Sequence, residues 1–199
     1  PGNEIGGIVT SYDATEYFRK RTENLMRVED IESTIKEFIR LSYSNSDGDV
    51  DNEKLSTIIS TVFASKPFVK NKNFDQLSLG EYIQLLLCDD TWQVVQTIFG
   101  IDKDSLRNLL DEIRKTRNDL AHFRSEITSY KQDQLKFCVT WISRRQEEWE
   151  MAREKAFNEE MIRKHQSIAQ STEPTSVSIE SETRQEKNVL QQDGPKDSR

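Results

Sequence analysis

The segment TRNDLAHF, residues 116–123, brings an arginine, an amide and a histidine close together as Arg117, Asn118 and His122. Histidine titrates near neutral pH and can accept or donate a proton, while a guanidinium can bind an oxyanion through two parallel hydrogen bonds. Cleavage of RNA without a metal needs both abilities: a base for the 2′-hydroxyl, an acid for the leaving 5′-oxygen, and a cation for the phosphorane-like transition state. The segment is therefore a candidate catalytic site, in which Asn118 would orient either partner.

The same segment also has a purely structural interpretation. On a helix, Asp119 and His122 could pair at i, i+3, and Arg117 could pair with an acid such as Asp111. The only other histidine, His165, lies where the charged last helix gives way to a polar segment. One folded domain then offers one useful histidine. A catalytic interpretation consequently requires a homodimer, whose two-fold axis would bring two copies of Arg117 and His122 to one cleft.

The composition limits which partners and cofactors are expected. The 199-residue chain has a formal net charge of −7, which argues against binding nucleic acid through overall charge, and DNA is not an expected partner. Arg114, Lys115 and Arg124 surround the motif, however, and are candidate RNA-binding residues. Cys88 and Cys138 are expected to be buried, reduced thiols, and the scattered ligands predict no metal site. No apolar stretch is long enough for a membrane span, so a cytoplasmic location is expected.

Apolar residues recur at helical spacing along most of the chain. In residues 28–41, for example, Val28, Ile31 and Ile35 are three and four positions apart, which is the period of an amphipathic helix. The helices predicted in this way span residues 14–21, 28–41, 54–64, 79–88, 89–99, 105–123 and 129–165. The motif therefore lies near the carboxyl end of a helix, in a mainly α fold that is expected to be a helical bundle.

The two ends of the chain differ from this helical centre. Residues 5–10, IGGIVT, predict one strand, with Asp13 as the N-cap of the helix that follows. Ser78 is predicted to cap the helix after it, and Gly100 to end another in the left-handed conformation. Ser, Thr, Glu and Gln dominate residues 166–199, which hold few apolar groups, so this tail is predicted to be disordered.

Residues 25–165 resemble a HEPN domain, an all-helical family whose ribonucleases carry an arginine, a polar residue, three further residues and a histidine. Arg117, Asn118 and His122 match that pattern without a gap, and residues 77–115 resemble the region that precedes the motif in one branch of the family. The resemblance implies a motif at a dimer interface that cuts RNA without a metal. Other HEPN domains are binding modules, so activity does not follow from the resemblance alone.

Residues 1–22 resemble a different family, the last strand and helix of a CBS (cystathionine β-synthase) domain. The family pattern of glycine, two apolar or small residues, threonine or serine, two variable residues and aspartate fits Gly7 to Asp13, with Thr10 in the hydroxyl position. The resemblance implies that Thr10 contacts the phosphate and Asp13 the ribose hydroxyls of an adenine nucleotide. Alternatively, both residues simply cap a helix. Only the end of such a domain is present, so we expect an N-terminally cut fragment that does not bind adenylate alone.

Together these observations predict three regions: a CBS remnant at residues 1–22, a HEPN-like helical domain at 25–165 and a disordered tail at 166–199. The expected function is that of a metal-independent endoribonuclease acting as a homodimer. It would need no cofactor for catalysis and would be regulated by an adenine nucleotide bound to the upstream CBS region. The alternatives are a non-catalytic dimerisation or partner-binding module coupled to that region, and a nucleotide-sensing adaptor.

Overall fold

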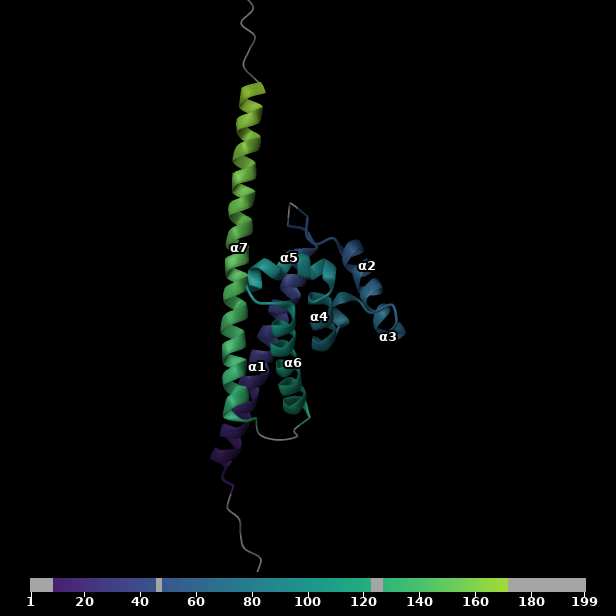
Figure 1. Ribbon diagram of the computed structural model, residues 1–199. Coiled ribbons are helices and arrows are strands. Elements are labelled where there is room, and N and C mark those ends of the chain that lie inside the picture. The colour runs from purple at the N-terminus through teal and green to yellow at the C-terminus, as the bar shows by residue number, and fades with distance from the viewer. Residues whose placement is uncertain (1–8, 46–47, 123–126, 172–199) are drawn as a thin grey trace, which may run out of the picture. The chain divides into compact units, whose positions relative to one another are not determined.

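The computed structural model describes residues 9–45, 48–122 and 127–171 of the chain, with side chains as far as residue 166. Within these residues the protein is helical, and its β contact is one isolated bridge between Ser44 and Val50. The elements in chain order are α1 (Ser11–Ser42), α2 (Asn52–Val62), α3 (Pro67–Lys70), the 3₁₀ helix η1 (Phe74–Gln76), α4 (Leu79–Leu86), α5 (Asp89–Phe99), α6 (Lys103–Ala121) and α7 (Ser129–Ser171) (Figure 1). The predicted mainly α bundle is confirmed.

The chain divides into two compact units, Pro1–Phe157 and Asn158–Arg199, and α7 begins in the first and ends in the second. All other helices belong to the first unit. The disordered tail was predicted to begin at residue 166. That boundary is wrong, because residues 166–171 still belong to α7. The rest of the predicted tail, residues 172–199, lies outside the described residues.

The first helix, α1, is continuous where the sequence predicted separate helices at residues 14–21 and 28–41. No glycine or proline interrupts the segment between them, so nothing in the backbone forces a break. The prediction of Asp13 as N-cap is also wrong. Thr10 is the N-cap, and its Oγ1 accepts a hydrogen bond from the Asp13 backbone N–H at 3.2 Å. The strand predicted at residues 5–10 lies largely outside the described residues.

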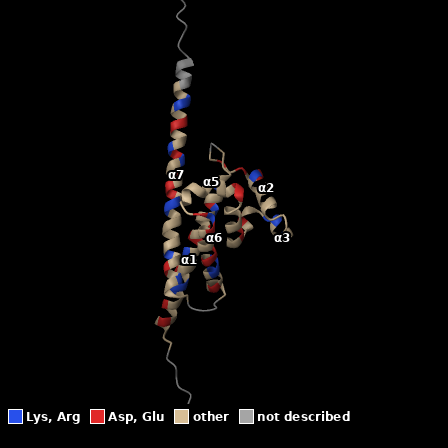
Figure 2. Cartoon of the chain, viewed as in Figure 1, with Lys and Arg blue, Asp and Glu red and all other residues tan. Residues whose placement is uncertain are grey.

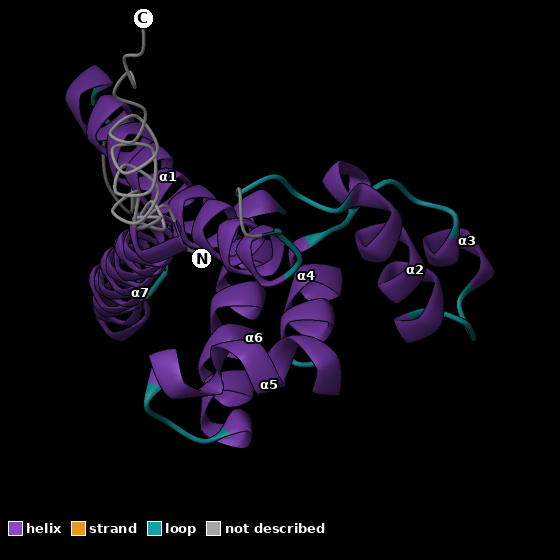
Figure 3. Ribbon diagram, turned by 90° about the horizontal axis from the view of Figure 1, so that it is seen from above, coloured by secondary structure: helices purple, strands orange, loops and turns teal. Residues whose placement is uncertain are grey.

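The inner face of α1 forms the centre of the first unit, where it packs against α4, α5 and α6. Burying one such aliphatic or aromatic side chain stabilises the fold by about 1.5–3 kcal/mol. The buried apolar residues of this face are Val28, Ile31, Ile35, Phe38 and Ile39. α2 and α3 lie at the edge of the bundle (Figure 3).

The first part of α7 packs against the carboxyl-terminal half of α1. The rings of Trp149 and Phe38 stack with centroids 5.3 Å apart. Arg153 reaches the end of α1, donating from Nη1 to the Leu41 carbonyl oxygen at 3.3 Å and from Nη2 to Ser44 Oγ at 2.8 Å. The Leu41 carbonyl oxygen also accepts from Ser44 Oγ at 2.9 Å, so Arg153 joins α7 to a helix end that is already capped. The fully buried residues of α7 are Leu135, Cys138 and Ile142.

Two predicted helix boundaries are confirmed, and a third is shifted. Ser78 is the N-cap of α4, and Gly100 ends α5 with a φ of 64°, a conformation that glycine adopts without a Cβ clash. α6 begins at Lys103, two residues before its predicted start. Asp102 caps it, because its Oδ1 accepts a hydrogen bond from the Ser105 backbone N–H at 2.8 Å.

The two cysteines have different environments, and both are free thiols. Cys138 is buried as predicted, and burial raises the pKa of its thiol to about 12. Cys88 is only half-buried, with its Sγ 3.2 Å from Thr91 Oγ1. Thr91 Oγ1 in turn lies 2.7 Å from the Tyr43 hydroxyl, so a buried polar contact ties the end of α1 to the start of α5.

Charged residues of both signs are interspersed along α6 and α7 rather than gathered into one face (Figure 2). Most ion pairs along these helices join residues three or four positions apart, and one example is Arg144 with Glu148 at 3.0 Å. Such exposed pairs contribute little to stability. Among the described helices, none combines the length and the apolar character needed to cross a membrane.

Candidate functional site

The TRNDLAHF motif lies on the last turns of α6, where two of its side chains border a small hollow. Arg117 and Asn118, together with Arg114, form one wall of this hollow, which has a volume of about 150 Å³. Residues 78–80, at the start of α4, form the other wall. Gly80 permits the close approach, because a Cβ atom there would lie 3.1 Å from Arg114 Cδ. We call this feature the arginine hollow.

The two arginines of the hollow differ in their partners. Arg114 Nε donates to Asp111 Oδ1 at 3.1 Å, a half-buried i, i+3 pair. The predicted pair between Arg117 and Asp111 is therefore wrong. The two positions are six residues apart, which is about 240° around a helix, whereas three residues bring side chains to one face. Arg117 is exposed, and within the described part of the chain its guanidinium has no hydrogen bond or ion pair.

His122 forms the C-cap of α6, and its backbone N–H donates to the Asn118 carbonyl oxygen at 3.0 Å. Its imidazole is exposed and has no hydrogen bond to any described residue. Five helical residues turn by about 140°, so Arg117 and His122 leave α6 in different directions. The structure thus places both at one helix end without bringing them to one face. The expected pair of Asp119 with His122 is replaced by an ion pair of Asp119 with Lys131 at 2.7 Å.

The other predicted RNA-binding cation that the structure describes, Lys115, does not line the hollow. Lys115 follows Arg114 in sequence but pairs with Glu112 at 2.6 Å and takes no part in the lining. Arg124 lies outside the described residues. His165, on the second unit, is exposed, and its Nδ1 lies 2.8 Å from the carbonyl oxygen one turn before it. Of the two predicted cations in the described part of the chain, Arg114 borders the motif's arginine and Lys115 does not.

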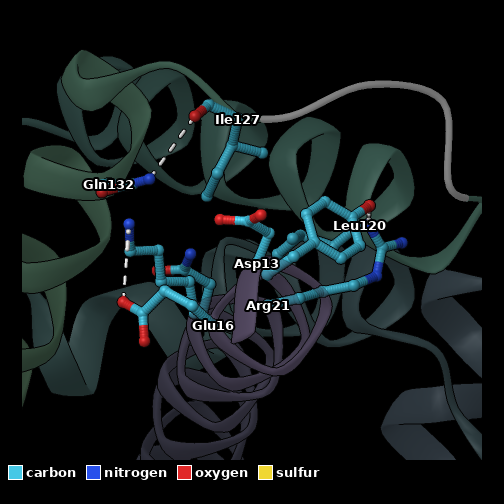
Figure 4. A pocket seen from close by; sticks show the side chains of 9 residues that line it. Asp13, Glu16, Arg21, Leu120, Ile127 and Gln132 are labelled. Atoms are coloured by element: carbon cyan, nitrogen blue, oxygen red, sulfur yellow. Dashed lines mark hydrogen bonds and ion pairs between the residues drawn. The ribbon is translucent and has the colours of Figure 1, made fainter. Parts of the chain in front are cut away.

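A second, larger cavity of about 300 Å³ lies between α1, the end of α6 and the start of α7 (Figure 4). We call it the polar cavity, because most of its lining is polar. Arg21 and Asn24 of α1 are 7% and 3% exposed, and Leu120 closes the α6 side. The other lining residues are Asp13, Glu16, Tyr17, Lys20, Ile127 and Gln132.

The charged groups of the polar cavity interact with one another and with Arg19, which lies outside the lining. A hydrogen bond from Arg19 lowers the pKa of Glu16 to about 2, and one from the Thr10 side chain lowers that of Asp13. Both carboxylates are therefore ionised at neutral pH. They offset Lys20, 3.5 Å from Glu16, and Arg21, which donates to the Tyr17 hydroxyl at 3.3 Å.

The structure places the two predicted nucleotide-binding residues together as a helix cap. Asp13 Oδ2 accepts hydrogen bonds from the Thr10 backbone N–H at 2.9 Å and from its Oγ1 at 2.6 Å. Asp13 also faces the polar cavity (Figure 4). No motif in the sequence predicted this cavity. Its signal is visible in retrospect: Arg21 and Asn24 occupy inward positions of the same helix whose later turns point apolar side chains inward.

Neither a group of metal-ligating side chains nor a similarity to known proteins indicates a function for the site. Among the described residues, no three or more His, Cys, Asp or Glu side chains are grouped so that they could hold a metal ion. The chain matches no protein-family model, no curated protein and no solved structure. The chemistry of the site must therefore be argued from the arginine hollow and from the helix end that carries His122.

Proposed function

We propose that this protein is a metal-independent endoribonuclease of the HEPN type that acts as a homodimer. The observation that carries the proposal is the exposed guanidinium of Arg117, which has no partner in the described chain and lies beside Arg114 and Asn118 in the arginine hollow. An arginine without a carboxylate partner is free to bind a phosphate bidentately. His122 presents its imidazole to solvent five residues further on.

The proposed reaction is a transesterification within the RNA strand. One histidine takes the proton of the 2′-hydroxyl, and the 2′-oxygen attacks the adjacent phosphorus. The bond from phosphorus to the 5′-oxygen breaks, and a second histidine returns a proton to that oxygen. Arg117 would stabilise the charge that develops on the non-bridging oxygens. The products are a 2′,3′-cyclic phosphate and a 5′-hydroxyl, so the substrate must carry a 2′-hydroxyl.

The geometry of α6 supports the dimer as the active form. Within one chain Arg117 and His122 leave the helix about 140° apart, and one chain contributes one motif histidine. A two-fold axis near the helix end would supply the second histidine and would set the arginine of one copy near the histidine of the other. We therefore assign the acid and base roles to the two copies of His122.

A non-catalytic coupling module is the second candidate, and the continuity of α1 favours it. This helix runs unbroken from the Thr10 cap, in the segment that resembles a CBS domain, into the core of the first unit. A displacement at its start would be transmitted along a rigid element. In either candidate an adenine nucleotide bound to the upstream CBS region would act as the regulator, as the resemblance of Thr10 and Asp13 implies.

The decisive experiment measures cleavage of a mixed RNA pool in excess EDTA by the parent chain and its variants. We expect His122→Ala to lower the rate by about 10²–10⁴-fold and Arg117→Ala by about 10²–10³-fold. Lys115→Ala is the matched control, because Lys115 is an exposed cation on the same helix outside the hollow. Its rate should stay within a few-fold of the parent. Equal cleavage by the parent and His122→Ala would reject the catalytic assignment.

Nucleotide regulation is tested separately, on the full-length gene product. Cleavage is titrated against ATP, AMP and S-adenosylmethionine, and a change in rate with one of them is the expected result. A flat response to all three would reject the regulatory part of the proposal and leave the nuclease part untouched. If the full-length product binds a nucleotide but neither it nor its variants cleave RNA, the coupling module becomes the better account.

A further inference from the structure

The first turns of α1 carry polar side chains in the positions where its later turns carry the apolar core. The buried apolar stripe of this helix begins at Val28 and alternates spacings of three and four residues. The same alternation, continued toward the start of the helix, reaches Asn24, Arg21 and Tyr17. All three line the polar cavity. A space of about 300 Å³ bordered by polar groups therefore replaces the core along this part of α1.

Asn24 is the most deeply buried polar residue of the cavity, and half of its amide is left open. The residue is 3% exposed. Its Oδ1 accepts a hydrogen bond from Arg27 Nη1 at 2.8 Å. Its Nδ2, however, donates to no residue in the described part of the chain. Because a buried donor without an acceptor costs free energy, the cavity is expected to hold a group that accepts from Asn24.

The groups beside Asn24 favour an anion as that acceptor. Arg21 precedes Asn24 by three residues, so the two side chains are neighbours on one face of α1. Arg21 is 7% exposed, and its guanidinium carries a permanent positive charge. It donates from Nη1 to the Tyr17 hydroxyl at 3.3 Å, and that hydroxyl keeps its own proton as a further donor. This end of the cavity thus offers both donors and positive charge.

The two carboxylates of the lining lie closer to the start of α1. Glu16 and Asp13 precede Arg21 by five and eight residues, or about 7 and 12 Å along the helix axis. Glu16 already accepts a hydrogen bond from Arg19 at 2.8 Å. Asp13 accepts one from Thr10 Oγ1 at 2.6 Å. Their charges therefore lie apart from the guanidinium, since the side chain that carries it extends away from both carboxylate groups (Figure 4).

Leu120 and Ile127 give the cavity an apolar wall besides its polar groups. Leu120 comes from the end of α6, and Ile127 stands two residues before the start of α7. The volume is at the lower end of the range for small-molecule sites, which combine apolar walls with a few convergent polar groups. The lining thus fits a ligand with one anionic group and a short aliphatic body.

We propose that the polar cavity binds a short-chain aliphatic carboxylate. One carboxylate oxygen accepts from Asn24 Nδ2 and the other from the Arg21 guanidinium. The aliphatic chain lies against Leu120 and Ile127. Inorganic phosphate matches the donors but not this apolar wall. The bound ligand contacts α1, α6 and the segment before α7 together, so it stabilises the folded chain.

The first test is calorimetric titration of the full chain with sodium acetate, butanoate and hexanoate at neutral pH. The affinity should rise by about fourfold for each added methylene, because each is buried against the apolar wall. Two further probes each lack one feature of the ligand: 1-hexanol lacks the charge, and inorganic phosphate lacks the aliphatic chain. Both should bind at least about tenfold more weakly than hexanoate. Hexanoate should also raise the melting temperature.

The second test replaces the amide donor. Asn24→Asp keeps an oxygen for Arg27, removes the Nδ2 donor and sets a negative charge against the ligand, so hexanoate affinity should fall at least about tenfold. Asn108→Asp is the matched control, because Asn108 is exposed on α6 outside the cavity, and its affinity should equal that of the parent. Circular dichroism verifies that the helices are intact. If Asn24→Asp does not fold, Tyr17→Phe replaces it, and loss of the hydroxyl beside the guanidinium should weaken binding about fivefold.

The outcomes separate this inference from the proposed function, because neither test uses RNA. Binding that strengthens with chain length and weakens in Asn24→Asp supports the carboxylate site. Neither heat nor a thermal shift with hexanoate would mean that water alone fills the cavity, and this result overturns the site. Phosphate bound as tightly as hexanoate overturns the aliphatic ligand. Equal affinity of the parent and a folded Asn24→Asp variant overturns the assignment to this cavity.

Discussion

The arginine hollow and the polar cavity both border α6, and their charges are arranged in opposite ways. The lining of the hollow contains two guanidiniums and no carboxylate, since Asp111, the partner of Arg114, lies outside it. The lining of the cavity contains two carboxylates against Lys20 and Arg21. Under the proposed function the hollow would offer its positive charge to an anion, whereas the cavity places carboxylates beside its own cations.

Burial adds to the contrast. Arg21 is almost fully buried, and a buried guanidinium costs several kcal/mol unless the surrounding groups compensate it. Arg117 is exposed and keeps most of its hydration in the absence of a ligand. We infer that the polar cavity contributes to stability, by joining the start of α1 to the end of α6 and the start of α7. Under the proposed function, the arginine hollow would contribute to recognition of an anion and little to stability.

The largest expected effects come from replacing each of the two arginines, Arg21 and Arg117, by alanine. Arg21→Ala should lower the free energy of unfolding by about 2 kcal/mol and the melting temperature by about 4–8 °C, because the groups around it lose their compensation. Its affinity for RNA should not change. Arg117→Ala should change stability by less than about 0.5 kcal/mol but weaken RNA binding.

Calorimetry and RNA titrations at several salt concentrations measure both properties. The slope of log K against log salt should fall by about 0.7 in Arg117→Ala, the amount expected for one lost phosphate contact on a single strand. Arg21→Ala should keep the parent slope. If Arg21→Ala lowers RNA affinity as strongly as Arg117→Ala does, at a temperature where both are folded, the division between a stabilising cavity and an anion-binding hollow is wrong.

The local parts of the site could be predicted from the sequence, because helix caps and periodicity depend on neighbouring residues. The position of the motif near the end of α6, the cap at Ser78 and the end of α5 at Gly100 all follow from patterns a few residues long. The N-cap of α1, which was predicted at Asp13 and lies at Thr10, also depends on a short local pattern. Thr10 and the aspartate three positions later form a capping box, but Thr10 also ends the apolar segment 5–10 that predicted a strand.

The hollow itself could not be predicted, because its second wall comes from far along the chain. Residues 78–80 and Arg114 meet only through the packing of α4 on α6, and no local pattern specifies that contact. The polar cavity was hidden for a different reason. The predicted domain boundary at residues 22–25 falls inside α1. It separates the inward polar Arg21 from Val28, although both lie on one continuous helix.

A smaller effect is expected from closing the hollow at Gly80. In Gly80→Ala the new Cβ would lie 3.1 Å from Arg114 Cδ, so the arginine must shift away from α4. RNA affinity should fall several-fold. Stability should hold or rise, since alanine is favoured over glycine inside a helix by up to about 1 kcal/mol. If Gly80→Ala binds RNA less tightly than the parent without a lower melting temperature, the hollow affects RNA binding independently of stability.

A double-mutant cycle shows whether this effect acts through Arg114. In an Arg114→Ala background, Gly80→Ala should have no further effect on RNA affinity, because the side chain that it displaces is gone. Additive losses in the double variant would mean that the start of α4 contacts RNA directly. That result would change the account of the hollow, although its volume and lining would be the same.

The smallest effect concerns Asp13, at the rim of the polar cavity. Hydrogen bonds from the Thr10 side chain and backbone lower the pKa of this carboxylate below its usual 3.8. Since the folded state holds the proton less tightly than the unfolded chain, ionised Asp13 stabilises the fold at neutral pH, and this contribution is lost as the pH falls through the lowered pKa. Asp13→Asn removes the charge and keeps the shape of the cap.

The variant should therefore melt slightly below the parent at neutral pH, and the gap should narrow as the pH falls below about 5. Thermal melts of both proteins from pH 7 downward measure it, with Asp104→Asn, an exposed carboxylate in the first turn of α6, as the control. A gap that does not change with pH would mean that the carboxylate's charge contributes nothing and that the cap works through its shape alone. The matched charges inferred for the polar cavity would then reduce to those of Glu16, Lys20 and Arg21.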